Sequence, residues 1–452
     1  MTKRHGYALL AALIAVVVVV SAAIYYLGAA SGNGGRDAFA DGRVPHNPAA
    51  PASAGTWVGA WSTSPAGAEP GTVRNGLAGR SLRNVIHAGT GGTSARITLS
   101  NLYGHQPLTI SHASLAVAAT PNSPTAAAGT LRRLTFAGHA TVRIPAGQQV
   151  VSDVAAIVIP YDSDVLVTTY SPTPSGPVTY HPRAQQTSYA ALGDRTQDTN
   201  GAAYTEQTPY WRYVTALDVL SNESNGTIVA IGDSLTDGST SSVGENRRWT
   251  DALTARLRAA DAGVPRYTVV NQGISGNRVL TAGSVVAPVG RGESAGIRIA
   301  QNPSGLSRFG RDVLGRTNVK AVVIALGVND ILRTPHQTDP RKITDGLRLL
   351  VRQAHARGLK VIGATLMPFR GHRGYQGGLD AVRRDVNAEI RDGAVFDAVV
   401  DFDKALQDPY DPRRLRADYD SGDHLHPSDK GYLRMADAFR LKDFKGSPPA
   451  EL

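Results

Sequence analysis

Short segments in which polar and apolar residues alternate dominate residues 57–222, and turn-forming residues separate them. Residues 94–100 alternate throughout, whereas residues 165–170 form a run rich in β-branched side chains. Both patterns are typical of strands in antiparallel sheets. The spacing of the turns predicts an all-β domain, a sandwich or jelly roll. Further strands are expected within residues 108–117, 140–144 and 150–159.

Three tryptophans of this region, Trp57, Trp61 and Trp211, allow two interpretations. They can line a platform that binds carbohydrate, or they can pack inside the protein. Because most Trp side chains are largely buried, packing in the core or between domains is favoured.

After a polar hinge at residues 221–226, the pattern changes to apolar strands that alternate with helices. Strands are predicted at residues 227–231, 267–271, 319–326, 359–366 and 398–402. Apolar residues at helical spacing predict helices at residues 249–260, 343–357 and 381–390, and Pro427 is expected to open a last helix that ends near residue 439. Strands joined by crossover helices imply an α/β domain with a parallel sheet, whose functional site lies beyond the carboxyl ends of the strands.

The N-terminus predicts an export signal. Lys3 and Arg4 precede an apolar run over residues 8–30 that is long for a cleaved signal peptide, although Ala38-Phe39-Ala40 resembles a cleavage site. A signal anchor at residues 1–30 is favoured over a signal peptide, and residues 31–56 read as a flexible linker. The protein is therefore expected outside the cytoplasm, either secreted or anchored in the membrane by this single segment.

The composition of the chain excludes several kinds of site and partner. The absence of cysteine excludes disulfides, thiolate metal sites and a cysteine nucleophile. The formal net charge of +10 is compatible with an anionic membrane or wall polymer, or serves only solubility. Arginines are spread along the chain with no basic run between aromatic residues, so no nucleic-acid partner is expected. The sequence leaves the oligomeric state open.

Four segments that follow predicted strands carry residues suited to acyl transfer. They read Gly232-Asp233-Ser234, "NQGISGN" at 271–277, "ALGVND" at 325–330 and "SGDHLHPSDKGY" at 421–432. A serine nucleophile needs a base, and His426 with Asp423 three residues earlier supplies an imidazole oriented by a carboxylate. The oxyanion needs donors, for which the Ser234 N–H, the Gly276 N–H and the Asn329 amide are candidates.

These four blocks resemble the SGNH (GDSL) hydrolase family. The resemblance implies a flavodoxin-like three-layer α/β/α domain over residues 223–452 and a serine carboxylesterase or acylhydrolase that requires no cofactor. It implies Ser234, Asp423 and His426 as the catalytic triad, with Gly276 and Asn329 in the oxyanion hole. The β region at 57–222 is similar to the N-terminal part of exported bacterial arylesterase/acylhydrolases, which implies acetyl, aryl or short-acyl esters of a small molecule, glycan or lipid.

Other residues of the motifs are assigned supporting roles. Asp233 is expected to shape the nucleophile turn, Asp330 to cap the following helix and Arg308 to anchor the site. His424 is expected to be structural, and no metal site is expected. Ser294 lies in a G-x-S-x-G pattern but lacks the preceding strand that a nucleophile elbow requires.

Two questions stay open at this stage. The segment 277–303 is long for the family and is expected to cover or reshape the acyl pocket. An acyltransferase with the same triad is the nearest alternative to a hydrolase, and a catalytically inert protein that binds glycans or cell wall is a more distant one.

Overall fold

The computed structural model describes residues 55–261, 263–284 and 301–446. The expected signal anchor, almost all of the linker, Ser294 and the middle of the 277–303 segment lie outside these ranges. In the part of the chain that is described, no helix has the length and hydropathy needed to cross a membrane.

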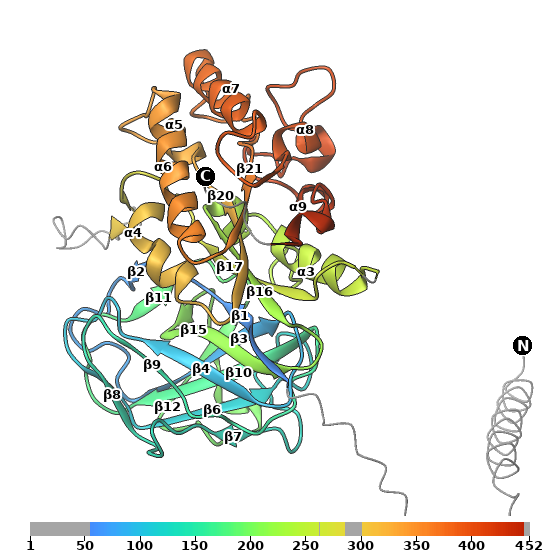
Figure 1. Ribbon diagram of the computed structural model, residues 1–452. Helices are drawn as coiled ribbons and strands as arrows, with labels where there is room; N and C mark the ends of the chain where they lie inside the picture. Colours follow the sequence, from blue (N-terminus) through green and yellow to red (C-terminus); the bar gives the residue numbers. More distant parts are fainter. Residues whose placement is uncertain (1–54, 262, 285–300, 447–452) are drawn as a thin grey trace, which may run out of the picture. The chain divides into compact units, whose positions relative to one another are not determined.

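A five-stranded parallel sheet forms the centre of the C-terminal part (Figure 1). Its order is β17 (Tyr267–Gly273), β16 (Gly226–Gly232), β20 (Val319–Ala325), β21 (Lys360–Ala364) and β22 (Ala398–Val400). Numbered along the chain this is the order 2-1-3-4-5, which is that of flavodoxin-like folds. The predicted α/β class is confirmed, and the order reverses between β16 and β20.

Helices cover the two faces of this sheet (Figure 1). They are α2 (Ser234–Asp237), α3 (Trp249–Ala259), α4 (Gly305–Phe309), α5 (Val328–Leu332), α6 (Pro340–His355), α7 (Gly377–Arg391), α8 (Phe402–Leu406) and α9 (Asp429–Asp437), with a π-helical turn η2 (Gly310–Leu314) and the 3-10 turns η3 (Ala417–Tyr419) and η4 (Leu441–Phe444). A further 3-10 turn, η1 (Gly201–Ala203), lies in the β-rich part of the chain. Helix α3 packs against α9, and α6 packs against α7. The last helix begins two residues later than expected from Pro427, because Ser428 caps it by accepting the Gly431 N–H.

The β-rich part consists mainly of two antiparallel sheets. One contains β1 (Thr56–Ser62), β15 (Val214–Ser221), β4 (Ala95–Ser100) and β9 (Gln149–Val151); the other contains β13 (Glu206–Thr208), β12 (Ser188–Leu192), β3 (Arg80–Ala88), β10 (Ser163–Ser171), β6 (His112–Val117) and β7 (Arg132–Arg133). Smaller sheets pair β14 (Trp211–Arg212), β11 (Thr179–His181) and β2 (Gly67–Ala68), and β5 (Leu108–Ile110) with β8 (Val142–Ile144). Apolar residues of both large sheets, such as Ile97 and Val167, meet in one core, as in a sandwich.

One expected strand is mostly absent. Of residues 150–159 only the start belongs to β9, and Ala155 and Ile159 form isolated bridges. The pairing with β4 is interrupted at Asp153, because its backbone N–H donates to Thr135 O (2.8 Å) and its carboxylate binds the N–H groups of Ala137 and Gly138.

The β-rich and α/β parts contact each other closely. Strand β1 packs against β16 and β17, and the Gly59 N–H donates to Thr227 Oγ1 (3.0 Å). Trp61 and Trp211 are buried and meet edge to face, with ring centroids 4.9 Å apart. The packing interpretation is confirmed for these two, whereas Trp57 lies under the Arg96 guanidinium. The boundary expected near residue 222 stays a prediction, because these parts belong to one compact unit.

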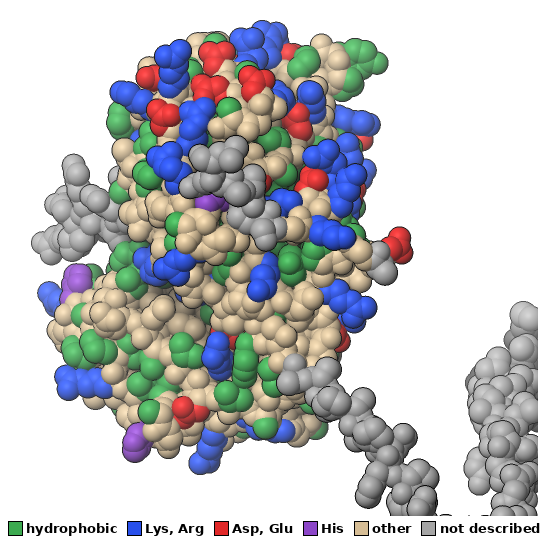
Figure 2. All heavy atoms as spheres, viewed as in Figure 1, with side chains coloured by type: hydrophobic (Ala, Val, Ile, Leu, Met, Phe, Trp, Pro, Cys, Tyr) green, Lys and Arg blue, Asp and Glu red, His purple; other side chains and the backbone are tan. Residues whose placement is uncertain are grey.

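Charged side chains of both signs are interspersed on the face of the molecule seen in Figure 2. Lys and Arg lie among Asp and Glu over the α/β part rather than in one continuous patch.

Candidate active site

Ser234 stands where β16 ends and the short helix α2 begins. Asp233 is the N-cap residue, and its Oδ1 accepts the Leu235 N–H (3.0 Å). Ser234 therefore occupies the first helical position at the carboxyl edge of the sheet, where backbone N–H groups have no acceptor within the helix. The predicted turn-shaping role of Asp233 agrees with this geometry.

His426 lies between Ser234 and Asp423. Its Nε2 is 2.8 Å from Ser234 Oγ, and its Nδ1 is 2.5 Å from Asp423 Oδ2. A carboxylate only accepts, so Nδ1 carries the proton and Nε2 of the neutral ring is free to accept the serine hydroxyl proton. The three residues predicted from separate segments are thus brought together in a nucleophile–base–carboxylate chain.

Asp423 is held in this orientation by its own backbone. Its Oδ1 accepts the N–H groups of Leu425 (3.0 Å) and His426 (2.8 Å). Burial raises the pKa of Asp423, but these bonds and His426 outweigh burial and lower the pKa below its ordinary value. Asp423 is therefore ionised when His426 takes up a proton.

Gly276 lies in a tight turn after β17. The Asn277 N–H donates to Ile274 O (3.0 Å), and Gly276 has φ +78°, the left-handed value that the third residue of a type II turn requires. Ser275, just before it, is fixed because its N–H and hydroxyl both donate to Asp237 Oδ2 (3.0 and 2.7 Å). This turn is called the oxyanion loop below (residues 274–277).

Asn329 lies in α5, at the end of the neighbouring strand β20. Its Oδ1 accepts Arg333 Nε (2.9 Å), which directs the amide NH2 the other way. Within the described residues this buried Nδ2 makes no hydrogen bond of good geometry, but the Asn329 side chain lies close enough to the Asp233 carboxyl to help lower its pKa. An unpaired buried donor is costly, and it is the kind of group that a developing oxyanion satisfies.

The carboxyl group of Asp233 is buried and poorly solvated. Burial raises its pKa to about 7, although the Leu235 N–H and Arg333 act in the opposite direction. A large fraction of Asp233 is therefore protonated near neutral pH, and Asp233 adds less negative charge beside Ser234 than its residue type suggests.

Asp330 does not cap a helix as predicted. Its carboxylate accepts the N–H groups of Val279 (2.8 Å) and Leu280 (3.1 Å), because the chain after the oxyanion loop folds back over α5. Asp330 thus joins the segments that carry Gly276 and Asn329.

Arg308 anchors the strand end, as expected. The buried guanidinium donates to Gly232 O (3.0 Å), to Asn277 Oδ1 (3.0 and 2.9 Å) and to Ser64 Oγ (2.9 Å), and it pairs with Asp312. One side chain thereby links the nucleophile turn, the oxyanion loop and the β-rich part.

His424 pairs with a carboxylate that is not part of the triad. Its Nδ1 is 2.6 Å from Asp420 Oδ2, and its backbone has φ +63°. This agrees with a structural role. Among the residues that the structure describes, no three His, Asp or Glu side chains are grouped as metal ligands would be.

The base of the 277–303 segment lies against the oxyanion loop. Strands β18 (Gly283–Ser284) and β19 (Gln301–Asn302) pair with each other, and Asn302 Nδ2 donates to Ser275 O (3.1 Å). Whether the segment covers the acyl pocket stays a prediction, because its middle is outside the described residues.

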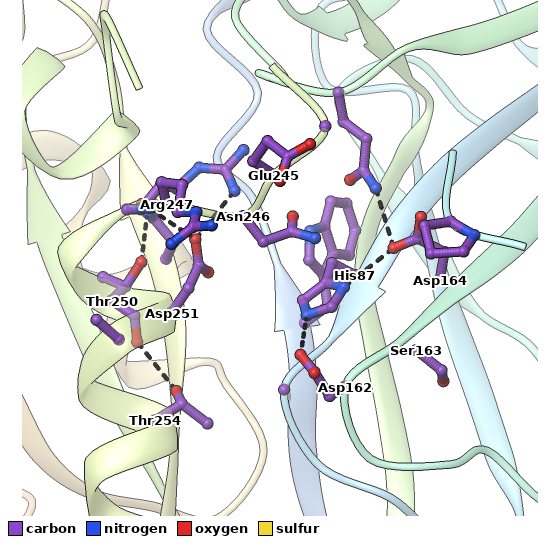
Figure 3. Close-up of a pocket in the computed structure, with 18 of the residues that line it drawn as sticks. His87, Asp162, Ser163, Asp164, Glu245, Asn246, Arg247, Thr250, Asp251 and Thr254 are labelled. Carbon is purple, nitrogen blue, oxygen red and sulfur yellow. Dashed lines mark hydrogen bonds and ion pairs between the residues drawn. The ribbon is translucent and has the colours of Figure 1, made fainter. Parts of the chain in front are cut away.

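A cavity of about 800 Å³ lies between β-rich loops and α3, and Ser234 is not among its lining residues (Figure 3). His87 stands in its wall, with Nδ1 and Nε2 each 3.0 Å from a carboxylate, of Asp164 and Asp162 respectively. Burial lowers the pKa of His87, but these neighbours outweigh it, so the pKa is raised. The cavity is separate from the triad.

The sequence did not reveal several residues of the site. Four such residues hold or border the catalytic groups: Arg333, Asn277, His181 and Asp237. The only signal in the sequence was that Asn277 and Asp237 fall within or beside the quoted motifs.

Comparison with known proteins identifies one family. Residues 230–434 match the family described as GDSL-like Lipase/Acylhydrolase. No curated protein matches the chain.

Solved structures similar to the chain cover about half of it. An acetylxylan esterase from Geobacillus stearothermophilus has 22% identity over 49% of this chain and 94% of its own, with a TM-score of 0.34. A member of the lipolytic protein G-D-S-L family from Veillonella parvula has 18% identity over 47% and 94%, with a TM-score of 0.32. A GDSL-like lipase from Bacteroides thetaiotaomicron has 18% identity over 47% and 84%, with a TM-score of 0.32.

Proposed function

Because residues 230–434 are a GDSL-like lipase/acylhydrolase domain, we propose that the protein is a serine carboxylesterase that acts through an acyl-enzyme on Ser234. The observation that carries the proposal is the position of His426, 2.8 Å from Ser234 Oγ and 2.5 Å from Asp423 Oδ2. A serine hydroxyl is a weak nucleophile without such a base.

The reaction follows from this geometry. Ser234 Oγ attacks the ester carbonyl carbon while its proton passes to His426 Nε2. Asp423 stabilises the imidazolium. The oxyanion is bound by the N–H groups of Ser234 and Gly276 and by the Asn329 amide. The tetrahedral intermediate collapses, and His426 returns the proton to the departing alcohol.

Water completes the cycle. His426 takes a proton from water as the water oxygen attacks the acyl carbon, and the proton then returns to Ser234 Oγ as the acid leaves. No cofactor enters these steps. If an alcohol takes the place of water, the same steps give an acyltransferase.

The test is hydrolysis of 4-nitrophenyl esters of increasing acyl length by the compact unit, residues 53–452, beside Ser234→Ala and His426→Ala. Loss of the triad is expected to lower kcat by about 10⁴–10⁶. A matched control is Ser242→Ala, which removes a serine whose hydroxyl bonds Asp429 on the exposed surface and does not contact the triad.

The alternatives give different results. In an acyltransferase, a fluorophosphonate labels Ser234, but the enzyme releases product only when an alcohol acceptor is added. An inert binding protein neither labels nor turns over, and binding of glycan or wall material then survives Ser234→Ala.

We also propose that the protein acts outside the cytoplasm, on an ester of a small molecule, glycan or lipid and without a nucleic-acid partner. The basic residues and the apolar run at the N-terminus support export. Fusing residues 1–56 to a reporter that is active only after export tests this, and a reporter that stays inactive would contradict it.

A further inference from the structure

The guanidinium of Arg333 lies directly over the oxyanion loop. Arg333 follows α5, and its Nε donates to Asn329 Oδ1 (2.9 Å). A Cβ built on Gly276 would be 3.0 Å from Arg333 Nη2. One cation thus contacts both positions that are proposed to bind the oxyanion.

The described part of the chain supplies this cation with no anionic partner. Among the described residues, no carboxylate lies at ion-pair distance from Arg333, and its two Nη groups make no hydrogen bond. The two acidic residues nearby are otherwise engaged: Asp330 binds two backbone N–H groups, and Asp233 is buried at the N-cap of α2. The Arg333 residue is exposed, so its two Nη groups are open to a ligand.

The backbone that carries Arg333 is held in place. The Arg333 N–H donates to Asn329 O (3.2 Å). Arg278 then clamps the next two residues, with Nη2 donating to Thr334 O (3.0 Å) and Nη1 to Pro335 O (3.3 Å). Little conformational entropy of Arg333 is therefore lost when a ligand binds it.

A second exposed arginine, Arg373, follows His372 directly in the chain. Arg373 is exposed and makes no ion pair within the described residues. Burial lowers the pKa of His372, and Asp423, His426, Arg373 and Arg333 are all close enough to act on that ring as charges. Both arginines thus lie around His372, beside the triad.

We infer that Arg333 binds an anionic group, a carboxylate, phosphate or sulfate, that the ester substrate carries close to its scissile carbonyl. The inference rests on the proposed esterase function and names its substrate class. A guanidinium presents two parallel N–H donors that match such oxyanions, and among the residues that the structure describes, only Nε of Arg333 is used. Arg333 is then a specificity residue, and through Asn329 it also positions a donor of the oxyanion hole.

The experiment compares matched esters that differ by one charge. On the acyl side, mono-4-nitrophenyl adipate is compared with its methyl ester. On the alcohol side, 4-acetoxybenzoate is compared with 4-acetoxybenzamide. The quantity is the ratio of kcat/KM for the anionic and the neutral member, measured for wild type, Arg333→Gln and Arg333→Lys at low and high salt.

We expect wild type to prefer the anionic member of one pair by about three- to tenfold at low salt, and added salt to reduce this preference. Arg333→Gln should abolish it and Arg333→Lys retain part of it. The ratio isolates recognition of charge, because disturbance of Asn329 slows both members of a pair. Arg357→Gln, an exposed arginine beyond the end of α6, is the control with the same change of net charge and should leave the ratio unchanged.

A ratio near one in both pairs for wild type, or a preference that survives Arg333→Gln, would overturn the inference. Such a result leaves the esterase function standing, because the neutral esters are still cleaved and a fluorophosphonate still labels Ser234. Absence of both cleavage and labelling would overturn the proposed function and this inference with it.

Discussion

His181 of β11 and Asp237 of α2 form a buried ion pair across the contact between the β-rich and α/β parts, with Nε2 2.9 Å from Oδ1. His181 Nδ1 is 2.8 Å from Ser64 O. A carbonyl and a carboxylate can only accept, so both ring nitrogens must donate and the ring is an imidazolium. Because the other oxygen of Asp237 binds Ser275, the pair supports the oxyanion loop.

Breaking this pair is expected to destabilise the protein. His181→Phe leaves Asp237 buried without its cation, which typically costs about 3–5 kcal/mol in the free energy of unfolding. Asp237→Asn in the same chain should recover part of that loss, because the uncompensated charge is then gone. Urea unfolding of the two single variants and the double variant measures the coupling, and strictly additive losses would show that the pair does not act as a unit.

The same pair predicts a pH dependence of stability. Burial lowers the pKa of His181, but Asp237 outweighs burial and raises the pKa above 6.5. A raised histidine pKa contributes stability that is complete below the unfolded-state value and is lost as pH rises through the folded-state value. The free energy of unfolding should therefore fall as pH rises above 6.5. Unfolding at several pH values tests this, and an equally steep fall in His181→Phe would count against it.

Asp233 predicts a second pH effect in a lower range. Its folded-state pKa of about 7 exceeds the ordinary value of 3.8, so the native state loses stability as pH rises between these values. Asp233→Asn keeps a capping oxygen but cannot ionise. As pH rises over this range, the free energy of unfolding of the variant should increase relative to that of wild type by up to about 1.4 kcal/mol per pH unit. A difference in unfolding free energy that stays constant from pH 4 to pH 7 would contradict the raised pKa.

Asn329→Ala should reduce turnover far more than binding. The variant removes one donor to the oxyanion, which typically costs about 10²–10³ in kcat. KM should change little, because the bond strengthens only as the oxyanion forms. Asn318→Ala, at the start of β20 on the opposite edge of the sheet, is a matched control. A large rise in KM with kcat preserved would assign Asn329 to substrate binding instead.

Asp423→Asn should lower kcat by on the order of 10⁴, because the amide no longer fixes the His426 tautomer that accepts from Ser234. Folding should be nearly unaffected, since the Asp423 side chain is 44% exposed. Kinetics and thermal unfolding on the same sample separate the two effects. Wild-type kcat in this variant would exclude the proposed orientation of the ring.

Much of the α/β part was predictable because its signals are local. A buried parallel strand is an apolar run, and the predicted strand at 227–231 differs from β16 (Gly226–Gly232) by one residue at each end. The motif residues follow such strands, and parallel strands place their carboxyl ends on one edge. Ser234 and Asn329 therefore had to come near each other once the sheet formed.

The predictions were wrong where a carboxylate can accept hydrogen bonds either from its own segment or from a distant one. Asp330 was expected to cap a helix, since Asp often does, but it binds the Val279 and Leu280 N–H groups of a segment about 50 residues earlier. Residues 150–159 look like a strand, yet Asp153 draws the backbone of another turn towards itself. No local pattern distinguishes these choices.

The sequence by itself determined the alternation of strands and helices and the class of the sheet, because periodicity is a property of short segments. The triad residues were predicted from motifs that resemble a known family. Only the tertiary structure decided that Arg333 covers the oxyanion loop with no anionic partner in the described part of the chain, and that His181 supports Asp237 from 56 residues away. Charge pairing and burial depend on which distant groups share a low-dielectric space, and the packing of the two parts creates that space.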